Sequence, residues 1–507
     1  MQTIVGLLRG GAAEAPAVRS VEDAPPLPYA GLRALAERTL RDLNSLGIGR
    51  GDRVALCVPN GPEAATAFAC IAAGATAAPL SPGLTLDELE FNLRDAGVKA
   101  LVLAPGSPLA ARHTADKLHL RTIDLVLHPE RGAGSFSIGA TSGVSAQLSA
   151  GGPAGEDDVA LVLHTSGSTS RPKIVPLLQR NLHASAQHIA TTLRLAPGDV
   201  GLNIMPLFHI HGLMAGVLAS LAAGAEVACA PGFNGLRFYE WFDRVRPTWY
   251  TAVPTMHQAI LARAPRHGAE IARSSLRFIR SSSASLPPQV MQKLEQTFRC
   301  PVIEAYGMTE AAHQMASNPL PPFAREPGCV GLAAGPQIEV MDERGIILPR
   351  GHVGEVVIRG PNVTPGYEQN AKANEAAFVE GWFRTGDQGV IDENGYLRLT
   401  GRLKELINRG GEKIAPLEVD VVLMDHPAVQ HCLTFAIPHD KLGEEVAAAV
   451  VLREGNSCTE RQLREFAAGR LADHKVPRRF VFVRDLPTGR TGKPQRIGLA
   501  EKLGLVG

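Results

Sequence analysis

The segment from Thr165 to Lys173, TSGSTSRPK, places hydroxyl side chains, glycine and a lysine directly after the apolar run LVLH. Backbone N–H groups, hydroxyls and a cation all bind phosphate oxygens, so this composition favours a loop that holds a triphosphate. The GxxxxGK[ST] order of a Walker loop is missing. The composition alone leaves open an ordinary polar turn after a strand.

Four further motifs contain residues suited to nucleotide chemistry. They are YGMTE (306–310), WFRTGD (382–387), GRLKELINRGGEKIAPLEVD (401–420) and LPTGRTGKPQR (486–496). An aromatic ring such as that of Tyr306 can stack on a base, and the carboxylate of Glu310 is a hard oxygen ligand for Mg²⁺. Taken alone, Tyr306 is equally explained as a core aromatic, and Asp387 as a turn residue.

Together these five ordered motifs resemble the signatures of the superfamily of acyl-CoA synthetases, adenylation domains and luciferases, over most of the chain. The resemblance implies two half-reactions. A carboxylate and ATP form an acyl-adenylate and pyrophosphate, and coenzyme A then takes the acyl group; Mg²⁺ is the implied metal. Ser170, Ile174 and Thr491 depart from the common residues of the motifs, but the charged and hydroxyl groups are kept.

The resemblance also implies roles for the matched residues. Lys493 neutralises charge between the carboxylate and the α-phosphate, where a positioned cation is worth most. Lys404 is the hinge of a mobile C-terminal domain, and Glu310 is the metal ligand. The implied catalytic residues are Lys493, Thr309 and His209. The implied nucleotide site comprises Thr165, Ser166, Gly167, Ser168, Thr169, Lys173, Ser283, Ala284, Glu304, Ala305, Tyr306, Thr309, Asp387, Arg402 and Lys493.

The acyl pocket is expected to be polar. Its expected segments are PLFHIHG (206–212), WYTAVPTMHQ (249–258), RSSSASL (280–286) and the residues after YGMTE. Histidines and hydroxyls favour a small polar acid, because a long apolar chain would leave each donor unpaired at a cost of about 1–3 kcal/mol. His313 lies four residues after Thr309, so on a helix both side chains would share one face.

Read as whole segments, residues 155–496 closely resemble the oxalate–CoA ligases. That resemblance implies that His209, Ser283 and His313 bind the second carboxylate of oxalate. The main alternative is a medium- or long-chain fatty-acid–CoA ligase. An amino-acid adenylation domain is disfavoured, because Asn234 stands where those domains carry an amine-binding aspartate. A nucleotide-binding protein without catalysis is disfavoured by the retained charged residues of the motifs.

Composition limits the remaining possibilities. The 507 residues are 45% hydrophobic and 20% charged, which predicts a soluble globular protein of two or more units. A net charge of +1 gives no broad electrostatic reason to expect nucleic acid or an anionic membrane. The seven scattered cysteines predict neither a disulfide framework nor a zinc site and favour a cytoplasmic location. The longest apolar stretch, Met214–Ala225, is too short to span a bilayer. We expect a monomer or small homo-oligomer.

The chemistry must be positioned by an α/β fold. Alternating strand-like and helix-like runs predict helix-covered parallel sheets, interrupted by a surface loop at 130–157. From about Gly331, short alternating strands predict a small antiparallel or barrel-like part. After Arg402 the pattern suggests a β-α-β-β-α order. We therefore expect a large N-terminal domain at 1–401 and a small mobile α+β domain at 402–507.

Overall fold

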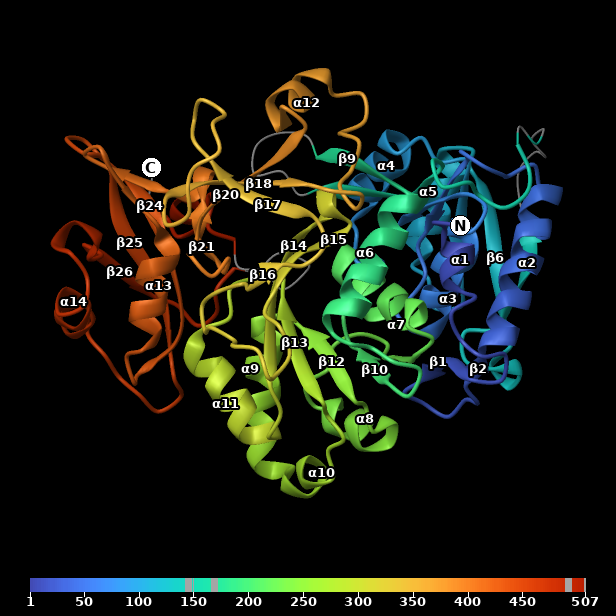
Figure 1. Cartoon of the computed structure of the whole chain (residues 1–507), viewed down its shortest axis with the longest axis horizontal. Coiled ribbons are helices and arrows are strands. Elements are labelled where there is room, and N and C mark those ends of the chain that lie inside the picture. Colours follow the sequence, from blue (N-terminus) through green and yellow to red (C-terminus); the bar gives the residue numbers. More distant parts are fainter. Residues whose placement is uncertain (142–147, 149, 166–171, 488–494, 506–507) are drawn as a thin grey trace.

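The structure is a computed structural model that describes residues 1–141, 148, 150–165, 172–487 and 495–505. Two large sheets covered by helices form most of the molecule (Figure 1). A seven-stranded sheet has the order β7-β6-β5-β3-β4-β8-β9 and is parallel except for its outer pairs β6–β7 and β8–β9. Its strands are β3 (Arg53–Leu56), β4 (Thr76–Pro79), β5 (Ala100–Leu103), β6 (Arg121–Leu127), β7 (Phe136–Thr141), β8 (Val159–Thr165) and β9 (Lys173–Leu178).

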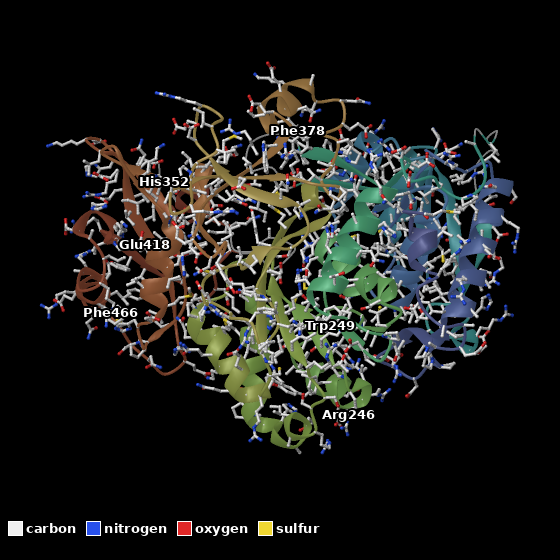
Figure 2. All side chains as sticks on the ribbon, in the orientation of Figure 1. Arg246, Trp249, His352, Phe378, Glu418 and Phe466 are labelled. Carbon is white, nitrogen blue, oxygen red and sulfur yellow. The ribbon has the colours of Figure 1, made fainter. Side chains whose placement is uncertain are left out.

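The nine-stranded sheet has the order β16-β15-β14-β13-β12-β10-β11-β1-β2, and its central strands are parallel. Its strands are β1 (Pro16–Ser20), β2 (Leu27–Pro28), β10 (Val200–Asn203), β11 (Glu226–Cys229), β12 (Trp249–Ala252), β13 (Phe278–Ser282), β14 (Val302–Met308), β15 (His313–Ser317) and β16 (Leu332–Ala333). Trp249, labelled in Figure 2, is 1% exposed and stacks on Phe278 with ring centroids 5.6 Å apart. The predicted helix-covered parallel sheets are therefore confirmed.

The helices of these two layers follow the apolar patterns of the sequence. They are α1 (Ile4–Leu7), α2 (Tyr29–Ser45), α3 (Pro62–Ala72), α4 (Leu86–Asp95), α5 (Leu109–Lys117), α6 (Gln179–Thr192), α7 (Ala219–Ala222), α8 (Phe238–Val245), α9 (Pro254–Arg263), α10 (Gly268–Ala272) and α11 (Pro288–Phe298), with a π-helical segment, η2 (Gly212–Leu218), before α7. Among the described residues, no helix combines the length and the apolar character needed to cross a membrane.

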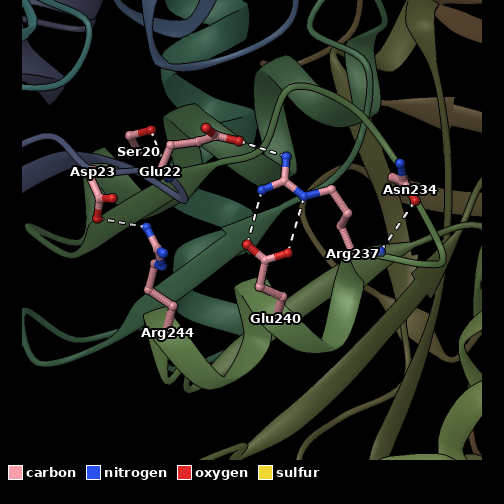
Figure 3. A network of polar contacts seen from close by, with 7 residues as sticks. All are labelled: Ser20, Glu22, Asp23, Asn234, Arg237, Glu240 and Arg244. Atoms are coloured by element: carbon pink, nitrogen blue, oxygen red, sulfur yellow. Dashed lines mark hydrogen bonds and ion pairs between the residues drawn. The ribbon is translucent and has the colours of Figure 1, made fainter.

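A surface network fixes the start of α8 to the turn after β1 (Figure 3). Arg237 pairs with Glu22 at 2.8 Å and with Glu240 at 3.0 Å, and Arg244 pairs with Asp23 at 2.8 Å. Asn234 accepts hydrogen bonds from the backbone N–H groups of Leu236 and Arg237. Asn234 therefore stabilises a local turn in this structure.

The third sheet is five-stranded and antiparallel, as expected for residues beyond Gly331. It contains β17 (Gln337–Met341), β18 (Val353–Arg359), β19 (Phe378–Val379), β20 (Trp382–Ile391) and β21 (Leu397–Arg402), with α12 (Ala371–Ala377) beside it. The loop expected at 130–157 is partly wrong, because residues 136–141 form β7, which pairs with the edge of the seven-stranded sheet.

The described residues from Ile407 onward form a sheet with its own apolar core at one end of the molecule (Figure 1). Its elements are β22 (Ile407–Arg409), β23 (Glu412–Ile414), α13 (Pro416–Met424), β24 (Val429–His439), β25 (Gly443–Leu452), α14 (Glu460–Ala468), β26 (Arg479–Phe482) and α15 (Leu499–Lys502). The β-α-β-β-α order expected after Arg402 is present from β23 to α14. The segment VDVVLM belongs to α13 because Pro416 begins a helix there, and the order from residue 416 is α-β-β-α-β.

Candidate functional site

The YGMTE motif ends β14 and leads into a tight reversal. A 3₁₀ turn, η4 (Thr309–Ala311), connects β14 to the antiparallel strand β15. A Cβ atom on Gly307 would lie 1.8 Å from the carbonyl oxygen of His313, so glycine is required at this close approach. Thr309 is half-buried at the start of the turn.

The expectation that a helix places His313 and Thr309 on one face is wrong. Ala312 and His313 have φ angles of 45° and 93°, and this left-handed backbone ends the turn and begins β15. His313 instead lies opposite Met308 in the antiparallel pair. A non-glycine residue with positive φ carries strain of about 1–3 kcal/mol, and such strain is concentrated at functional sites.

Three of the predicted nucleotide residues meet between β14, β20 and β21. The hydroxyl of Tyr306 donates to the Asp387 carboxylate at 2.5 Å, and Arg402 pairs with the other oxygen of Asp387 at 3.0 Å. Burial raises the pKa of Tyr306 far above its ordinary value, so its hydroxyl stays a donor. The negative charge of Asp387 raises the pKa of Arg402. Asp387 is buried, whereas the Arg402 side chain is 56% exposed.

Glu310 forms a second cluster. Its carboxylate is buried and accepts a hydrogen bond of 2.9 Å from the hydroxyl of Tyr367. The ammonium of Lys173 lies 4.2 Å from the centre of the Tyr367 ring. Burial raises the pKa of Glu310, and the positive charges of Arg402 and Lys173 oppose that rise.

The Glu310 cluster fits a Mg²⁺ ion that is bound jointly by a protein carboxylate and by the phosphates of a substrate. No group of three or more acidic, histidine or cysteine side chains that could hold a metal ion occurs among the described residues. Mg²⁺ is commonly held by one or two carboxylates together with substrate phosphates. Glu310 provides the hard oxygen, and Lys173 provides a positive charge beside it.

The acyl-site histidines form a packed pair. The His211 and His313 rings stack with centroids 4.8 Å apart, and both residues are buried. The nitrogen Nδ1 of His211 lies 3.0 Å from the Ser283 hydroxyl. His209 is half-buried and accepts a bond of 3.3 Å from the His211 backbone N–H through Nδ1. The structure thus brings His209, Ser283 and His313 together around His211.

Two residues beside this pair were not singled out from the sequence. Arg280 in β13 is 0% exposed, and its guanidinium contacts His211, Thr251 and Gln314 at 3.3–3.4 Å. Thr251 in β12 is the register partner of Arg280. An arginine flanked by apolar residues in RFIRS was the available signal, since arginine is rarely fully buried without a partner.

The remaining predicted residues lie nearby or outside the described part. Thr165 is the register partner of Lys173. The Glu304 carboxylate accepts from the Leu286 N–H, and burial raises its pKa to about 8. The Ala305 carbonyl accepts from Ser282. Ala284 follows Ser283, whose φ is 75°. Ser166, Gly167, Ser168, Thr169 and Lys493 lie outside the described residues.

The expected hinge, Lys404, lies in the exposed 3₁₀ turn η5 (Leu403–Glu405) between β21 and β22. A cavity of about 460 Å³ lies beside this turn, between the antiparallel sheet of β17–β21 and the C-terminal sheet. It is bordered by Met341, Glu355, Arg384, Leu403, Leu406 and Lys413, among others. These two sheets are therefore not packed tightly against each other beside the turn.

Arg496, at the end of the last motif, anchors this region. It pairs with Glu405 at 3.1 Å and with Asp420 at 3.0 Å, and it donates to the Thr434 carbonyl at 2.6 Å. The Arg496 and Asp420 side chains are 13% and 4% exposed. The arginine thus ties the chain after the predicted catalytic lysine to the turn that contains Lys404.

Changing Arg496 to Met is expected to lower the free energy of unfolding of the C-terminal part by about 3 kcal/mol or more, because Asp420 is left buried without its cation. Burial already raises the pKa of Asp420. Loss of Arg496 raises it further, so the deficit should shrink as the pH falls through the raised pKa of Asp420 in the folded variant, because a protonated carboxyl needs no cation. Calorimetry is the suitable measurement, since all three tryptophans lie before residue 402.

Arg479→Met is the matched control, because Arg479 is 56% exposed and its pair with Glu460 is 3.9 Å long. An exposed pair of that kind contributes about 1 kcal/mol at most. Equal losses of unfolding free energy in the two variants would show that the buried pairs of Arg496 stabilise the protein no more than an exposed pair does.

Comparison with known proteins agrees with this geometry. A family model described as AMP-binding enzyme matches residues 10–368, and one described as AMP-binding enzyme C-terminal domain matches residues 418–493. An oxalate–CoA ligase of Arabidopsis thaliana is 45% identical over 97% of both chains. An oxalate–CoA ligase of Saccharomyces cerevisiae is 40% identical over 89% of this chain and 87% of that one. The crystal structure of ATP-bound MatB from Rhodopseudomonas palustris superposes with a TM-score of 0.88 at 30% identity, over 99% of this chain and 98% of that one.

Proposed function

Because the chain belongs to the AMP-binding enzyme family, we propose that it is an ATP-dependent ligase that adenylates oxalate and transfers the oxalyl group to coenzyme A. The observation that carries the choice of acid is the buried polar cluster of His211, His313, Ser283 and Arg280. A long apolar chain would leave these groups unpaired, at about 1–3 kcal/mol each. The names of the two oxalate–CoA ligases support the same acid.

In the first half-reaction, one carboxylate oxygen of oxalate attacks the α-phosphorus of ATP, the bond to the β-phosphate oxygen breaks, and pyrophosphate leaves. No general base is needed, because the acid is ionised near neutral pH. We assign Thr309 and Lys493 to the α-phosphate, where negative charge develops. Glu310 would hold Mg²⁺, which neutralises phosphate charge when bound. Asp387, held by Tyr306 and Arg402, is assigned to the ribose hydroxyls.

In the second half-reaction, the coenzyme A thiol, after losing its proton, attacks the oxalyl carbonyl, and AMP leaves. We propose that the part beginning at residue 402 pivots at Lys404 between the two steps. The open junction beside η5 and the separate apolar core of the C-terminal sheet support this division at 401–402. Seven free cysteines favour a reducing, cytoplasmic location, and a monomer or small homo-oligomer stays our expectation.

A panel of acids tests the proposal. With ATP, Mg²⁺ and coenzyme A, we expect oxalate to release AMP with a kcat/KM at least about tenfold above that of octanoate, because only oxalate satisfies the buried donors. Formation of oxalyl-CoA is confirmed by mass spectrometry. Faster turnover of octanoate would contradict the choice of acid and leave the acyl-CoA synthetase reaction in place.

A further inference from the structure

Arg280 is a buried cation without a counter-ion among the residues that the structure describes. It is 0% exposed, its contacts are Thr251, His211 and the Gln314 amide, and its Nε has no hydrogen-bond partner. Burial lowers the pKa of Arg280 to about 9, so the guanidinium still carries its charge near neutral pH. An uncompensated buried charge costs several kcal/mol. A group this costly in the interior is better explained by the site beside it than by stability.

The contacts of Arg280 define a directed chain of hydrogen bonds. A guanidinium only donates, so it donates to the Thr251 hydroxyl at 3.4 Å, and the nitrogen Nε2 of His211 that faces it at 3.4 Å is an acceptor. Thr251 then donates to the same Nε2 at 2.7 Å. These partners assign the proton of a neutral His211 to Nδ1.

The proton on Nδ1 determines the role of Ser283. His211 Nδ1–H donates to the Ser283 hydroxyl oxygen at 3.0 Å, which leaves the Ser283 hydrogen available for a ligand. Ser283 has a φ of 75°, and His313, stacked on His211, has a φ of 93°. Both strained residues therefore contact His211 at the end of this series of hydrogen bonds. Backbone strain of this kind is concentrated at functional sites.

We propose that Arg280 is a specificity-determining positioning residue, which acts through Thr251 and His211 to present Ser283 as a hydrogen-bond donor to the second carboxylate of a small dicarboxylate. The inference rests on the proposed function. It assigns the preference for a doubly charged acid to a buried charge on β13 rather than to the pocket-lining groups alone. β12 and β13 lie side by side in the centre of the molecule, and Thr251 and Arg280 are register partners there (Figure 1).

Two substitutions test the chain at different links. Arg280→Met removes the charge, and Thr251→Val removes the connecting hydroxyl at constant shape. We expect either change to raise the KM for oxalate about tenfold to a hundredfold, with a smaller change in kcat and none in the KM for ATP. The kcat/KM for acetate, which has no second carboxylate, should stay within about twofold. Arg280→Lys, which keeps the charge without the planar fork, should restore part of the loss.

Thermal stability separates positioning from a structural role. Replacing an unpaired buried charge by an apolar side chain is neutral or stabilising, so Arg280→Met should keep or raise the Tm while oxalate selectivity falls. Thr434→Val is the control for Thr251→Val on substrate binding, since Thr434 is equally buried in a strand and lies in the C-terminal sheet. It should leave the KM for oxalate unchanged.

An unchanged KM for oxalate in both variants overturns the inference and leaves the proposed function intact. A lower Tm with equal losses for oxalate and acetate also overturns it, because that pattern belongs to a structural residue. A wild-type enzyme that releases no AMP with oxalate overturns the proposed function itself, and the inference with it.

Discussion

Changing Lys493 to Ala is expected to abolish adenylation while largely sparing thioester formation from supplied oxalyl-adenylate. A positioned cation stabilises the charge that develops between the carboxylate and the α-phosphate, and removal of one such donor typically costs about 10²–10³ in rate. In the second half-reaction the coenzyme A thiol attacks the carbonyl carbon, and the proposed pivot at Lys404 takes this lysine away from the reacting groups. The first half-reaction is followed by oxalate-dependent exchange of pyrophosphate into ATP, and the second by release of AMP from the adenylate.

Lys502→Ala is the matched control for the loss of one positive charge. Lys502 lies at the end of α15, is exposed and donates to Gln495 at 2.9 Å. It should leave both half-reactions unchanged. Equal loss of the two half-reactions in Lys493→Ala would show that the lysine role is misassigned.

Changing His313 to Ala should raise the KM for oxalate by a large factor, about tenfold or more, with the KM for ATP unaffected. The imidazole is buried against His211 at 4.8 Å, and a hydrogen bond to a carboxylate contributes about 1.5–3 kcal/mol. An unchanged KM for oxalate in steady-state kinetics would remove His313 from the site.

His313→Gly separates substrate binding from backbone strain. Both variants lack the imidazole, but glycine adopts the φ of 93° freely whereas alanine does not. The glycine variant should therefore be the more stable of the two by about 1 kcal/mol, with the same KM for oxalate. A lower KM in the glycine variant would mean that strain, rather than the missing ring, causes the defect.

Local patterns predicted the elements of the large domain well. The alternation of strand-like and helix-like runs matches the observed elements, for example α2 (Tyr29–Ser45) before β3 and α3 (Pro62–Ala72) before β4. Short irregular features were less predictable. Left-handed backbone at Ala312 replaced the expected helix at His313 by a strand, and residues 136–141 joined a sheet edge that no local signal indicates.

The candidate site also contains residues that the sequence predicted and residues that it did not. Ordered motifs identified Tyr306, Asp387 and Arg402, which form one hydrogen-bonded cluster. Thr251 lies in β12, Arg280 lies in β13 and His211 precedes η2, so the contacts among these three residues depend on the register of β12 against β13. That register is set by the packing of the whole sheet and is not visible in a single sequence.

The buried charge of Arg280 also predicts which substitutions a laboratory selection for stability would favour in this enzyme. Most natural proteins lie close to the minimum stability that their function requires, and costly buried groups are the sites where stabilising changes are easily found. A screen for heat resistance alone should therefore enrich apolar replacements at this position, and the survivors should discriminate less between oxalate and simple monoacids. Selection for stability in this chain is best combined with a counter-screen on acid preference.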